Sequence, residues 1–327
     1  MRRRESLGFL CGWVASWPAC SPAAKRTPVV GVLWHAADER EEAPFLGQLR
    51  LGLQELGYVE GRSITLVNTY ASERYERFAL NARSLVEQRV DVIVAITRPA
   101  ALAAQQATRT IPIVAVAVSD PVGSGLVSSL ARPGGNITGL GNWAVDLAAK
   151  RVELLKEAVK GLTRVALLVN PGDPGLAKTF VRASTAAADR LGLSIQAIEA
   201  TRVEEIEAGF SAISPSERTG LIVNNDPFLL MEAERIARLA QARGMPSMGF
   251  ARSMCKQGML LAYGPDNLAI FRRSATYVDK ILKGARPADL PVEQPTEYRL
   301  IVNARTAKAL GYAIPAALLN RADELVE

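Results

Sequence analysis

Residues 91–118 read DVIVAITRPAALAAQQATRTIPIVAVAV. Two apolar runs, Asp91–Ile96 and Ile111–Val118, flank a stretch from about Pro99 to Thr108 that is rich in alanine. Uninterrupted apolar runs of this length predict strands that are buried on both faces, and the segment between them predicts a helix. A strand, a helix and a second strand in this order indicate a parallel sheet that is covered by helices.

The same alternation extends toward the N-terminus. Pro28–Trp34 predicts a buried strand, and Phe45–Leu56 repeats apolar residues at helical spacing. Ser63–Tyr70 alternates as a strand does, and Glu73–Gln88 predicts a second helix. Together with the first stretch, these segments predict one sheet of four strands with helices between them.

A segment rich in glycine and proline, Asp120–Gly141, interrupts the alternation, and a second series follows it. The strands predicted in this second series are Arg164–Val169, Ser194–Ala200, Gly220–Asn224 and Met259–Tyr263. The same supersecondary pattern therefore occurs twice. We expect an α/β fold of two doubly wound parallel-sheet lobes.

The first 24 residues do not fit this pattern. Met1–Arg4 is basic, Ser6–Ala19 carries no charge, and small residues follow up to Ala24. This order predicts a signal peptide over residues 1–24, cleaved near Ala23 or Ala24, and hence export to the periplasm. Two alternatives stay open: a lipid anchor on Cys20, and a buried N-terminal helix.

Composition narrows the class of protein. The formal net charge is +6, but basic residues stand beside acidic ones and only 6% of residues are aromatic. A nucleic-acid-binding face usually gathers its basic residues, so we expect no nucleic-acid partner. The chain holds one histidine and three cysteines, two of them in the predicted signal peptide. This set predicts neither a metal cluster nor a bound cofactor.

Motifs of common enzyme classes are absent from the sequence. The first predicted strand is not followed by GxGxxG, no GxSxG occurs, and the glycine-rich run 134–141 lacks the Lys-Ser/Thr of a phosphate-binding loop. We therefore expect a binding protein and not an enzyme. One enzymatic alternative stays open, in which Asp120 and Asp226 act as a pair of carboxylates.

Polar and aromatic residues follow the predicted strands. Ligands of open parallel sheets bind beyond the carboxyl ends of the strands, and two facing lobes would share one cleft there. The candidate ligand-binding residues are Trp34, His35, Thr97, Arg98, Asp120, Trp143, Asn170, Asp226, Phe228 and Tyr263.

The candidates suit different parts of a small ligand. Thr97 stands where it would cap a helix from Pro99, whose N-terminus attracts a carboxylate. Asp120 and Asp226 are suited to an ammonium group, so Asp120→Ala would weaken binding by more than about tenfold. Arg98 is suited to an anion. The aromatic candidates for stacking are Trp34, Trp143, Phe228 and Tyr263. Each Asp-Pro pair also has an ordinary role in starting a turn.

Two longer segments carry a family resemblance. They are Asp120–Gly139, which reads DPVGSGLVSSLARPGGNITG, and Ala275–Glu327, which includes ATYVDKILKGARPADLPVEQP and ends in IPAALLNRADELVE. With them, the sequence from about residue 28 to the end closely resembles the ABC-transporter substrate-binding proteins whose characterised relatives are linked to tryptophan and tyrosine uptake.

The resemblance implies more than the residue patterns do. It implies a periplasmic-binding-protein fold of type 1, whose lobes are joined by a hinge of three crossings. The first lobe would hold 28–142 plus about 266–285, and the second 143–262 plus about 293–327. The implied partners are a membrane permease and an ATPase. The implied ligand is an amino acid or an aromatic amino-acid-like compound, captured by closure of the cleft; Arg98, where small residues are expected, raises a small organic anion as the alternative.

Overall fold

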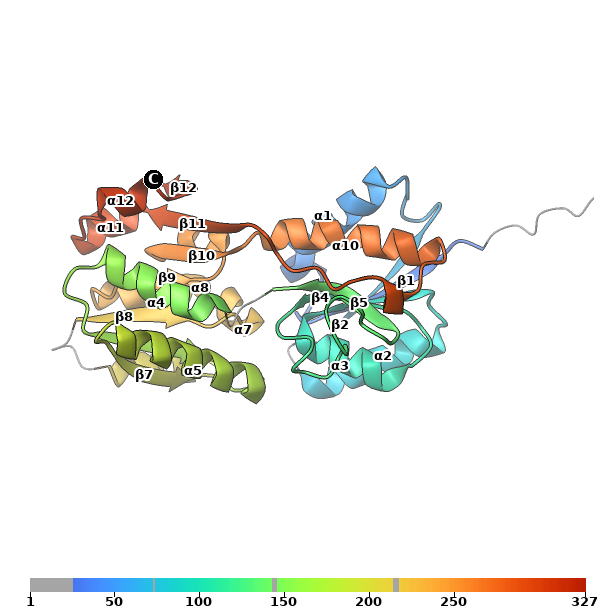
Figure 1. Ribbon diagram of the computed structural model, residues 1–327, viewed down its shortest axis with the longest axis horizontal. Helices are drawn as coiled ribbons and strands as arrows, with labels where there is room; N and C mark the ends of the chain where they lie inside the picture. Colours follow the sequence, from blue (N-terminus) through green and yellow to red (C-terminus); the bar gives the residue numbers. More distant parts are fainter. Residues whose placement is uncertain (1–25, 73, 143–145, 214–217) are drawn as a thin grey trace, which may run out of the picture.

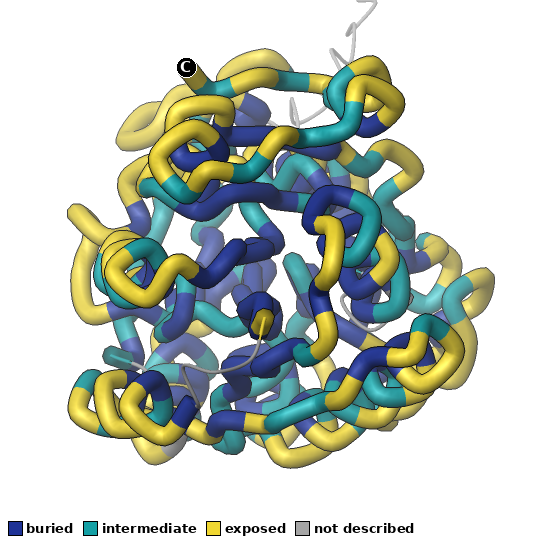
Figure 2. The backbone as a smooth tube through the Cα atoms, turned by 90° about the vertical axis from the view of Figure 1, so that its left-hand side faces the viewer, coloured by how far each residue is buried: buried dark blue, intermediate teal, exposed yellow. Residues whose placement is uncertain are grey.

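Two α/β lobes lie end to end along the longest axis of the molecule (Figure 1). The computed structural model describes residues 26–72, 74–142, 146–213 and 218–327. The predicted fold class is confirmed, since each lobe is a sheet with helices on both faces (Figure 1). In the view along the long axis, buried segments lie mostly inside and exposed residues lie mostly on the outer segments of the chain (Figure 2). In the part of the chain that is described, no helix is both long and apolar enough to span a bilayer.

The first lobe is built on a sheet of five parallel strands in the order β2-β1-β3-β4-β5. The strands are β1 (Val29–Trp34), β2 (Thr65–Tyr70), β3 (Val92–Ile96), β4 (Ile113–Val118) and β5 (Ile137–Gly141). The sequence predicted the first four and assigned β5 to the glycine-rich interruption. Gly139 explains the difference: its φ is +146°, and a Cβ there would lie 1.8 Å from the Ala115 carbonyl oxygen, so this edge strand needs glycine to pair with β4.

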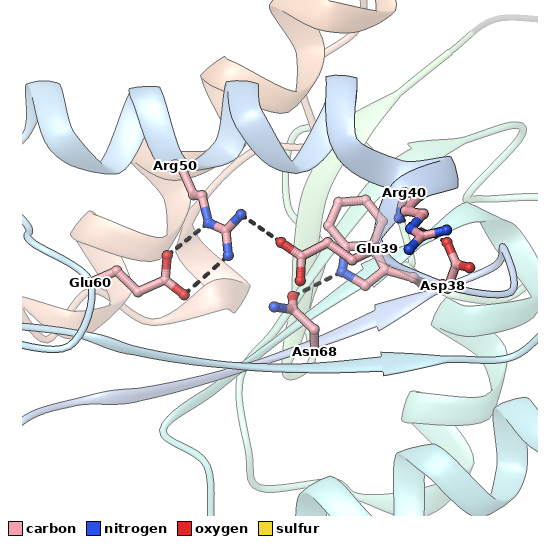
Figure 3. Close-up of polar contacts among 7 residues, drawn as sticks. Asp38, Glu39, Arg40, Arg50, Glu60 and Asn68 are labelled. Atoms are coloured by element: carbon pink, nitrogen blue, oxygen red, sulfur yellow. Dashed lines mark hydrogen bonds and ion pairs between the residues drawn. The ribbon is translucent and has the colours of Figure 1, made fainter.

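Two pairs of helices cover this sheet. One face carries α1 (Glu39–Glu55) and α10 (Asn267–Leu282), and the other carries α2 (Tyr75–Glu87) and α3 (Thr97–Ala107). A Cβ on Gly52 of α1 would lie 2.4 Å from the Arg272 carbonyl oxygen of α10, so the two helices touch at their backbones. Arg50 of α1 donates to Glu39 and Glu60 on the outside of this lobe (Figure 3). Helix α10 thus belongs to the core of the first lobe although it follows the second series in sequence.

The second lobe holds a sheet of seven strands in the order β12-β11-β10-β9-β8-β6-β7. All its pairs are parallel except β10 with β11. The strands are β6 (Arg164–Val169), β7 (Ser194–Glu199), β8 (Thr219–Val223), β9 (Ser247–Gly249), β10 (Leu261–Pro265), β11 (Tyr298–Asn303) and β12 (Glu324–Val326). The strands β9 and β12 have three residues each and are too short to give the apolar run by which β6, β7, β8 and β10 were predicted.

Helices cover both faces of the second sheet as well. One face carries α4 (Asp146–Ala158), α5 (Pro174–Arg190), α11 (Ala304–Leu310) and α12 (Ala316–Leu319). The other carries α6 (Val203–Ser211), α7 (Pro227–Met231), α8 (Ala233–Ala242) and α9 (Arg252–Lys256).

The chain passes between the lobes three times. It crosses from β5 to α4, from β10 to α10, and from the 3-10 turn η1 (Pro287–Asp289) to β11. Backbone bonds hold the last crossing against β5, since Gly141 N–H donates to the Glu293 carbonyl and Glu293 N–H donates to the Gly139 carbonyl. The two lobes are thus joined by three separate segments of the chain.

Candidate functional site

A cavity of about 310 Å³ lies between the two lobes. It opens where the strands of both sheets end. In the first lobe, His35 follows β1, Thr97 follows β3 and Ser119 follows β4. In the second lobe, Asn170 follows β6, and Asn225 with Asp226 follow β8. The location is the one that open parallel sheets use for ligands, and we call it the interlobe cavity.

Five phenylalanine side chains form the apolar part of the interlobe cavity. The rings of Phe45 and Phe271 are 4.7 Å apart between centroids and tilted by 34°. Both belong to helices of the first lobe, α1 and α10. The other rings are those of Phe78, Phe228 and Phe250. Rings contributed by both lobes suit a ligand with an aromatic or apolar body.

The first-lobe wall contains backbone in an unusual conformation. Thr97 has φ 76° and Ala117 has φ 57°, both in the left-handed region and both lining the cavity. A left-handed β-branched residue is a genuine outlier, and such strain of about 1–3 kcal/mol is held by the surrounding structure. The predicted role of Thr97 as a helix cap is wrong. Helix α3 begins at Thr97 itself, and no side chain caps it.

A histidine and a buried glutamate meet at the edge of the cavity. The side chain of His35 is 12% exposed, and its Nε2 lies 3.4 Å from Oε1 of Glu42, which is 1% exposed. The backbone N–H of Ala36 donates to the same Glu42 oxygen at 3.2 Å. The glutamate thus fixes the turn after β1 and places the imidazole beside the cavity.

One ion pair bridges the two lobes. Nη1 of Arg98, on α3, lies 3.3 Å from Oδ1 of Asp173, which caps α5 by accepting from Leu176 N–H. The side chains are 25% and 17% exposed. A pair with this exposure contributes at most about 1 kcal/mol. Its main consequence is that Asp173, from the opposite lobe, offsets the positive charge of Arg98.

Side chains at strand ends form the second-lobe wall. Nδ2 of Asn170 donates to Oδ1 of Asp226 at 3.2 Å, and Oδ1 of Asn170 accepts from Gly172 N–H at 2.9 Å. Oδ1 of Asp226 also accepts from Leu229 N–H, which caps α7. These bonds hold an amide and a carboxylate in place at the cavity without strained backbone.

A buried arginine stands behind this wall. Arg151 of α4 is 0% exposed; its Nε donates to the Tyr263 carbonyl at 2.8 Å and its Nη1 to Oδ1 of Asn225 at 2.5 Å. Burial lowers the pKa of Arg151 to about 9, because the charged form has lost its hydration. Neither Arg151 nor Asn225 was predicted from the sequence to be a site residue. The sequence does carry one signal for Arg151. It stands at helical spacing from Ala148 and Leu155, so it is a charged residue on the face that α4 buries.

The structure brings six of the predicted site residues to the interlobe cavity. They are His35, Thr97, Arg98, Asn170, Asp226 and Phe228. Trp34, Asp120 and Tyr263 are not among the residues that line it. Trp143 lies outside the described residues.

Trp34 is a core residue of the first lobe. It is 0% exposed, its ring stacks on Phe271 with centroids 5.8 Å apart, and its indole N–H donates to Oδ1 of Asn68 on β2 at 2.9 Å. Side chains alternate along a strand, and Val30, Val32 and Trp34 all point under α1 and α10. The prediction that Trp34 contacts a ligand is therefore corrected: it supports Phe271, which does line the cavity.

Asp120 and Tyr263 also have other placements than expected. Asp120 is exposed, has φ 45°, and accepts from Gly123 N–H at 2.8 Å, so it organises the turn after β4. The ring of Tyr263 packs against Tyr298, with centroids 6.2 Å apart, and its carbonyl faces Arg151. Asp120 is thus separate from the wall that holds Asp226, which removes the geometry of the proposed carboxylate pair.

A wider cavity of about 620 Å³ adjoins the first and shares His35, Phe45 and Phe250 with it. Its remaining wall includes exposed residues, among them Met231 and Leu268, and the charged Arg252 and Lys256. It does not contain the residues that end β3, β4, β6 and β8. Within the described ranges, no group of three or more His, Cys, Asp or Glu side chains is arranged to hold a metal ion in either cavity.

Comparison with known proteins gives a consistent result. A family model described as ABC transporter substrate binding protein matches residues 45–326. A protein of Clostridioides difficile (strain R20291) named tyrosine-binding protein is 26% identical over 274 residues, which cover 82% of this chain and 78% of that protein.

Solved structures extend the comparison. A conserved domain protein from Vibrio cholerae is 29% identical, has a TM-score of 0.85, and is matched over 92% of this chain and 100% of that one. An ABC domain from Streptococcus pneumoniae in complex with L-Trp is 24% identical, with a TM-score of 0.83 and the same coverage. The ligand-free, open structure of a substrate-binding protein from Clostridium difficile is 25% identical, has a TM-score of 0.68, and is matched over 92% of this chain and 99% of that one.

Proposed function

Since the chain belongs to the ABC transporter substrate-binding protein family, we propose that it captures an amino acid with an aromatic or apolar side chain for import. The observation that carries this proposal is the composition of the interlobe cavity. Phenylalanine rings from both lobes lie beside a carboxylate, Asp226, and two amides, Asn170 and Asn225. The rings suit a side chain, and the polar groups suit a zwitterionic head group.

The size of the cavity agrees with a small ligand. A volume of about 310 Å³ is at the lower end of the range for small-molecule sites, about 300–1,000 Å³. A single amino acid suits such a space better than an oligosaccharide or a peptide does. The named function of the Clostridioides difficile relative, tyrosine binding, supports the same class of ligand.

The charges around the cavity favour a zwitterion over a simple anion. Arg98 made an organic anion the alternative ligand, but Asp173 meets its charge across the cavity. Because Arg98 and Asp173 offset each other's charge, Asp226 is the lining carboxylate that is left for a ligand. A ligand ammonium group can donate a further hydrogen bond to the Asp226 carboxylate. A ligand carboxylate at the same place would be repelled by the negative charge of Asp226.

Closure of the lobes is the proposed mechanism. A ligand that touches both walls stabilises the arrangement in which the walls are close, and so shifts the population toward it. The better match to the structure that holds L-Trp than to the open, ligand-free one supports a closed arrangement here. The Arg98–Asp173 pair, which joins the lobes, would add a small share to the closed state.

Location and partners follow from the same proposal. The basic and apolar order of residues 1–24 supports export to the periplasm, with cleavage near Ala23 or Ala24 or a lipid on Cys20. The closed protein would then dock on a membrane permease that is driven by an ATPase. No cofactor and no reaction enters this mechanism.

A thermal-unfolding screen of the exported protein tests the proposal. The set contains L-tryptophan, L-tyrosine, L-phenylalanine, succinate, benzoate and glucose. A ligand at one hundred times its Kd stabilises by about 2.7 kcal/mol, which raises the Tm by several degrees. We expect such a rise with at least one aromatic amino acid. A rise with succinate or benzoate alone would show the organic-anion alternative to be right, and a rise with glucose alone would overturn both.

A further inference from the structure

Arg151 is a buried cation for which the described part of the chain supplies no carboxylate partner. Its hydrogen-bond acceptors among the described residues are two neutral oxygen atoms, the Tyr263 carbonyl and Oδ1 of Asn225. The third nitrogen, Nη2, is buried and has no hydrogen-bond partner among the described residues. Burying a charge without a counter-charge is expensive, so a group at this place that brings negative charge would stabilise it.

The bond from Arg151 also fixes the direction of the Asn225 amide. Asn225 lines the interlobe cavity and is only 8% exposed. Its Oδ1 accepts from Nη1 of Arg151, so the carbonyl end of the amide is turned toward the arginine. The two N–H donors of Nδ2 are at the opposite end, and no described residue accepts from them. An amide held in this way presents donors, and its dipole is aligned with the charge behind it.

Asp226 stands directly after Asn225 on the same wall. A carboxylate and an amide that presents donors therefore lie on consecutive residues. The α-ammonium and α-carboxylate groups of an amino acid have the complementary pattern, since they are carried by one carbon atom. The opposing wall is less suited to a carboxylate, because Pro99 in the first turn of α3 has no N–H to donate.

We propose that Asn225, with Arg151 behind it, receives the carboxylate of the ligand while Asp226 receives its ammonium group. Arg151 is then a positioning residue that acts through Asn225, and Asn225 sets the preference for a free carboxylate. This inference rests on the proposed function of amino-acid capture.

The test compares acids with the matching amides. Calorimetric titration with L-tryptophan, L-tyrosine, L-tryptophanamide and L-tyrosinamide is made on the full exported protein and on Asn225→Asp. The wild-type protein should bind the acids at least tenfold more tightly than the amides. Asn225→Asp brings a carboxylate to Arg151 and removes the two N–H donors of the amide. The affinity for the acids should therefore fall at least thirtyfold, while the affinity for the amides should change by less than threefold.

Stability separates this role from a merely structural one. Asn225→Asp pairs the buried charge of Arg151, so its Tm should rise even as binding of the acids weakens. Asn320→Asp makes the same change of charge at an exposed position and should leave both Tm and affinity unchanged. Arg151→Lys keeps the charge without the planar fork, and should reduce the preference for acids over amides while the amides still bind.

The possible failures are distinguishable. Equal binding of acids and amides by the wild-type protein, or acid binding by Asn225→Asp at the wild-type level, would overturn the inference and leave amino-acid capture standing. A fall in the Tm of Asn225→Asp would show that no pairing with Arg151 takes place. The lack of binding by all four compounds would overturn the proposed function and this inference together.

Discussion

The two walls of the interlobe cavity present their polar groups in different ways. In the first lobe, Thr97 directly after β3 and Ala117 within β4 are held in left-handed conformations. In the second lobe, the corresponding turns after β6 and β8 are relaxed, and side chains of Asn170, Asn225 and Asp226 point at the cavity. The first wall thus offers three of the five rings, strained backbone and Arg98, whereas the second offers two rings, the amides and Asp226. We infer that the second lobe recognises the head group and that the first lobe closes over the side chain of the ligand.

The largest effect should come from the second wall. Asp226→Ala removes the partner of the ammonium group, and we expect affinity for L-tyrosine or L-tryptophan to fall about 100-fold in calorimetric titration. The same change also removes the cap of α7, at a cost of about 1 kcal/mol in the free energy of unfolding. Asp226→Asn is the matched control, since it keeps an acceptor for Leu229 N–H. It should restore the stability but not the affinity; restored affinity would contradict an ionic role.

The rings of the first wall should have a smaller effect that depends on the ligand. Phe45→Ala removes one of the two rings in contact at this wall, and we expect about tenfold weaker binding of aromatic amino acids. Leu80→Ala is the control, because Leu80 is an apolar residue of the same lobe that is 63% exposed and lies outside the cavity. Equal affinities of the two variants would mean that the ring of the ligand lies elsewhere.

The strain of the first wall should be visible in stability. Thr97→Gly removes the backbone strain of a threonine in the left-handed region, which is about 1–3 kcal/mol. This gain exceeds the entropic cost of ordering a glycine on folding, about 0.5–1 kcal/mol. We expect a net stabilisation of about 1 kcal/mol in thermal unfolding, with about threefold weaker binding as the wall loosens. Thr276→Gly, in the ordinary helix α10, should instead destabilise by about 0.3 kcal/mol, the difference in helix propensity between the two residues. If Thr97→Gly destabilises to the same extent, the strain is not real.

The smallest effect on affinity should be at Asp120. The sequence favoured a ligand contact for this residue, but its carboxylate accepts from Gly123 N–H at the exposed turn after β4. We now expect Asp120→Ala to change affinity by less than twofold. Stability should fall by about 1 kcal/mol, since the turn loses an acceptor and alanine tolerates φ 45° less well than aspartate. A tenfold loss of affinity would return Asp120 to the site.

Much of the architecture was predictable, because uninterrupted apolar runs specify buried strands. The glycine-rich strand β5 and the short β9 were not, since neither shows such a run. Residues at strand ends were placed less well. His35, Asn170 and Asp226 were predicted correctly because they follow strands. The same reasoning failed for Trp34, which is still within β1 and faces the core.

Other parts of the site could not be found from spacing. Arg151 and Asn225 are 74 residues apart in sequence, and only the packing of α4 under the sheet brings them together. The pairing of Arg98 with Asp173 likewise depends on how the two lobes face each other. Contacts of this kind are long-range, so local pattern and propensity carry no information about them.

A crystal structure of the protein with a bound aromatic amino acid tests the central claim most directly. The account predicts that the ligand fills the interlobe cavity, with its head group within hydrogen-bond distance of Asn225 and Asp226 and its ring beside Phe45 and Phe271. A ligand in the adjoining cavity near Met231 and Arg252, or one that touches a single lobe, would contradict it.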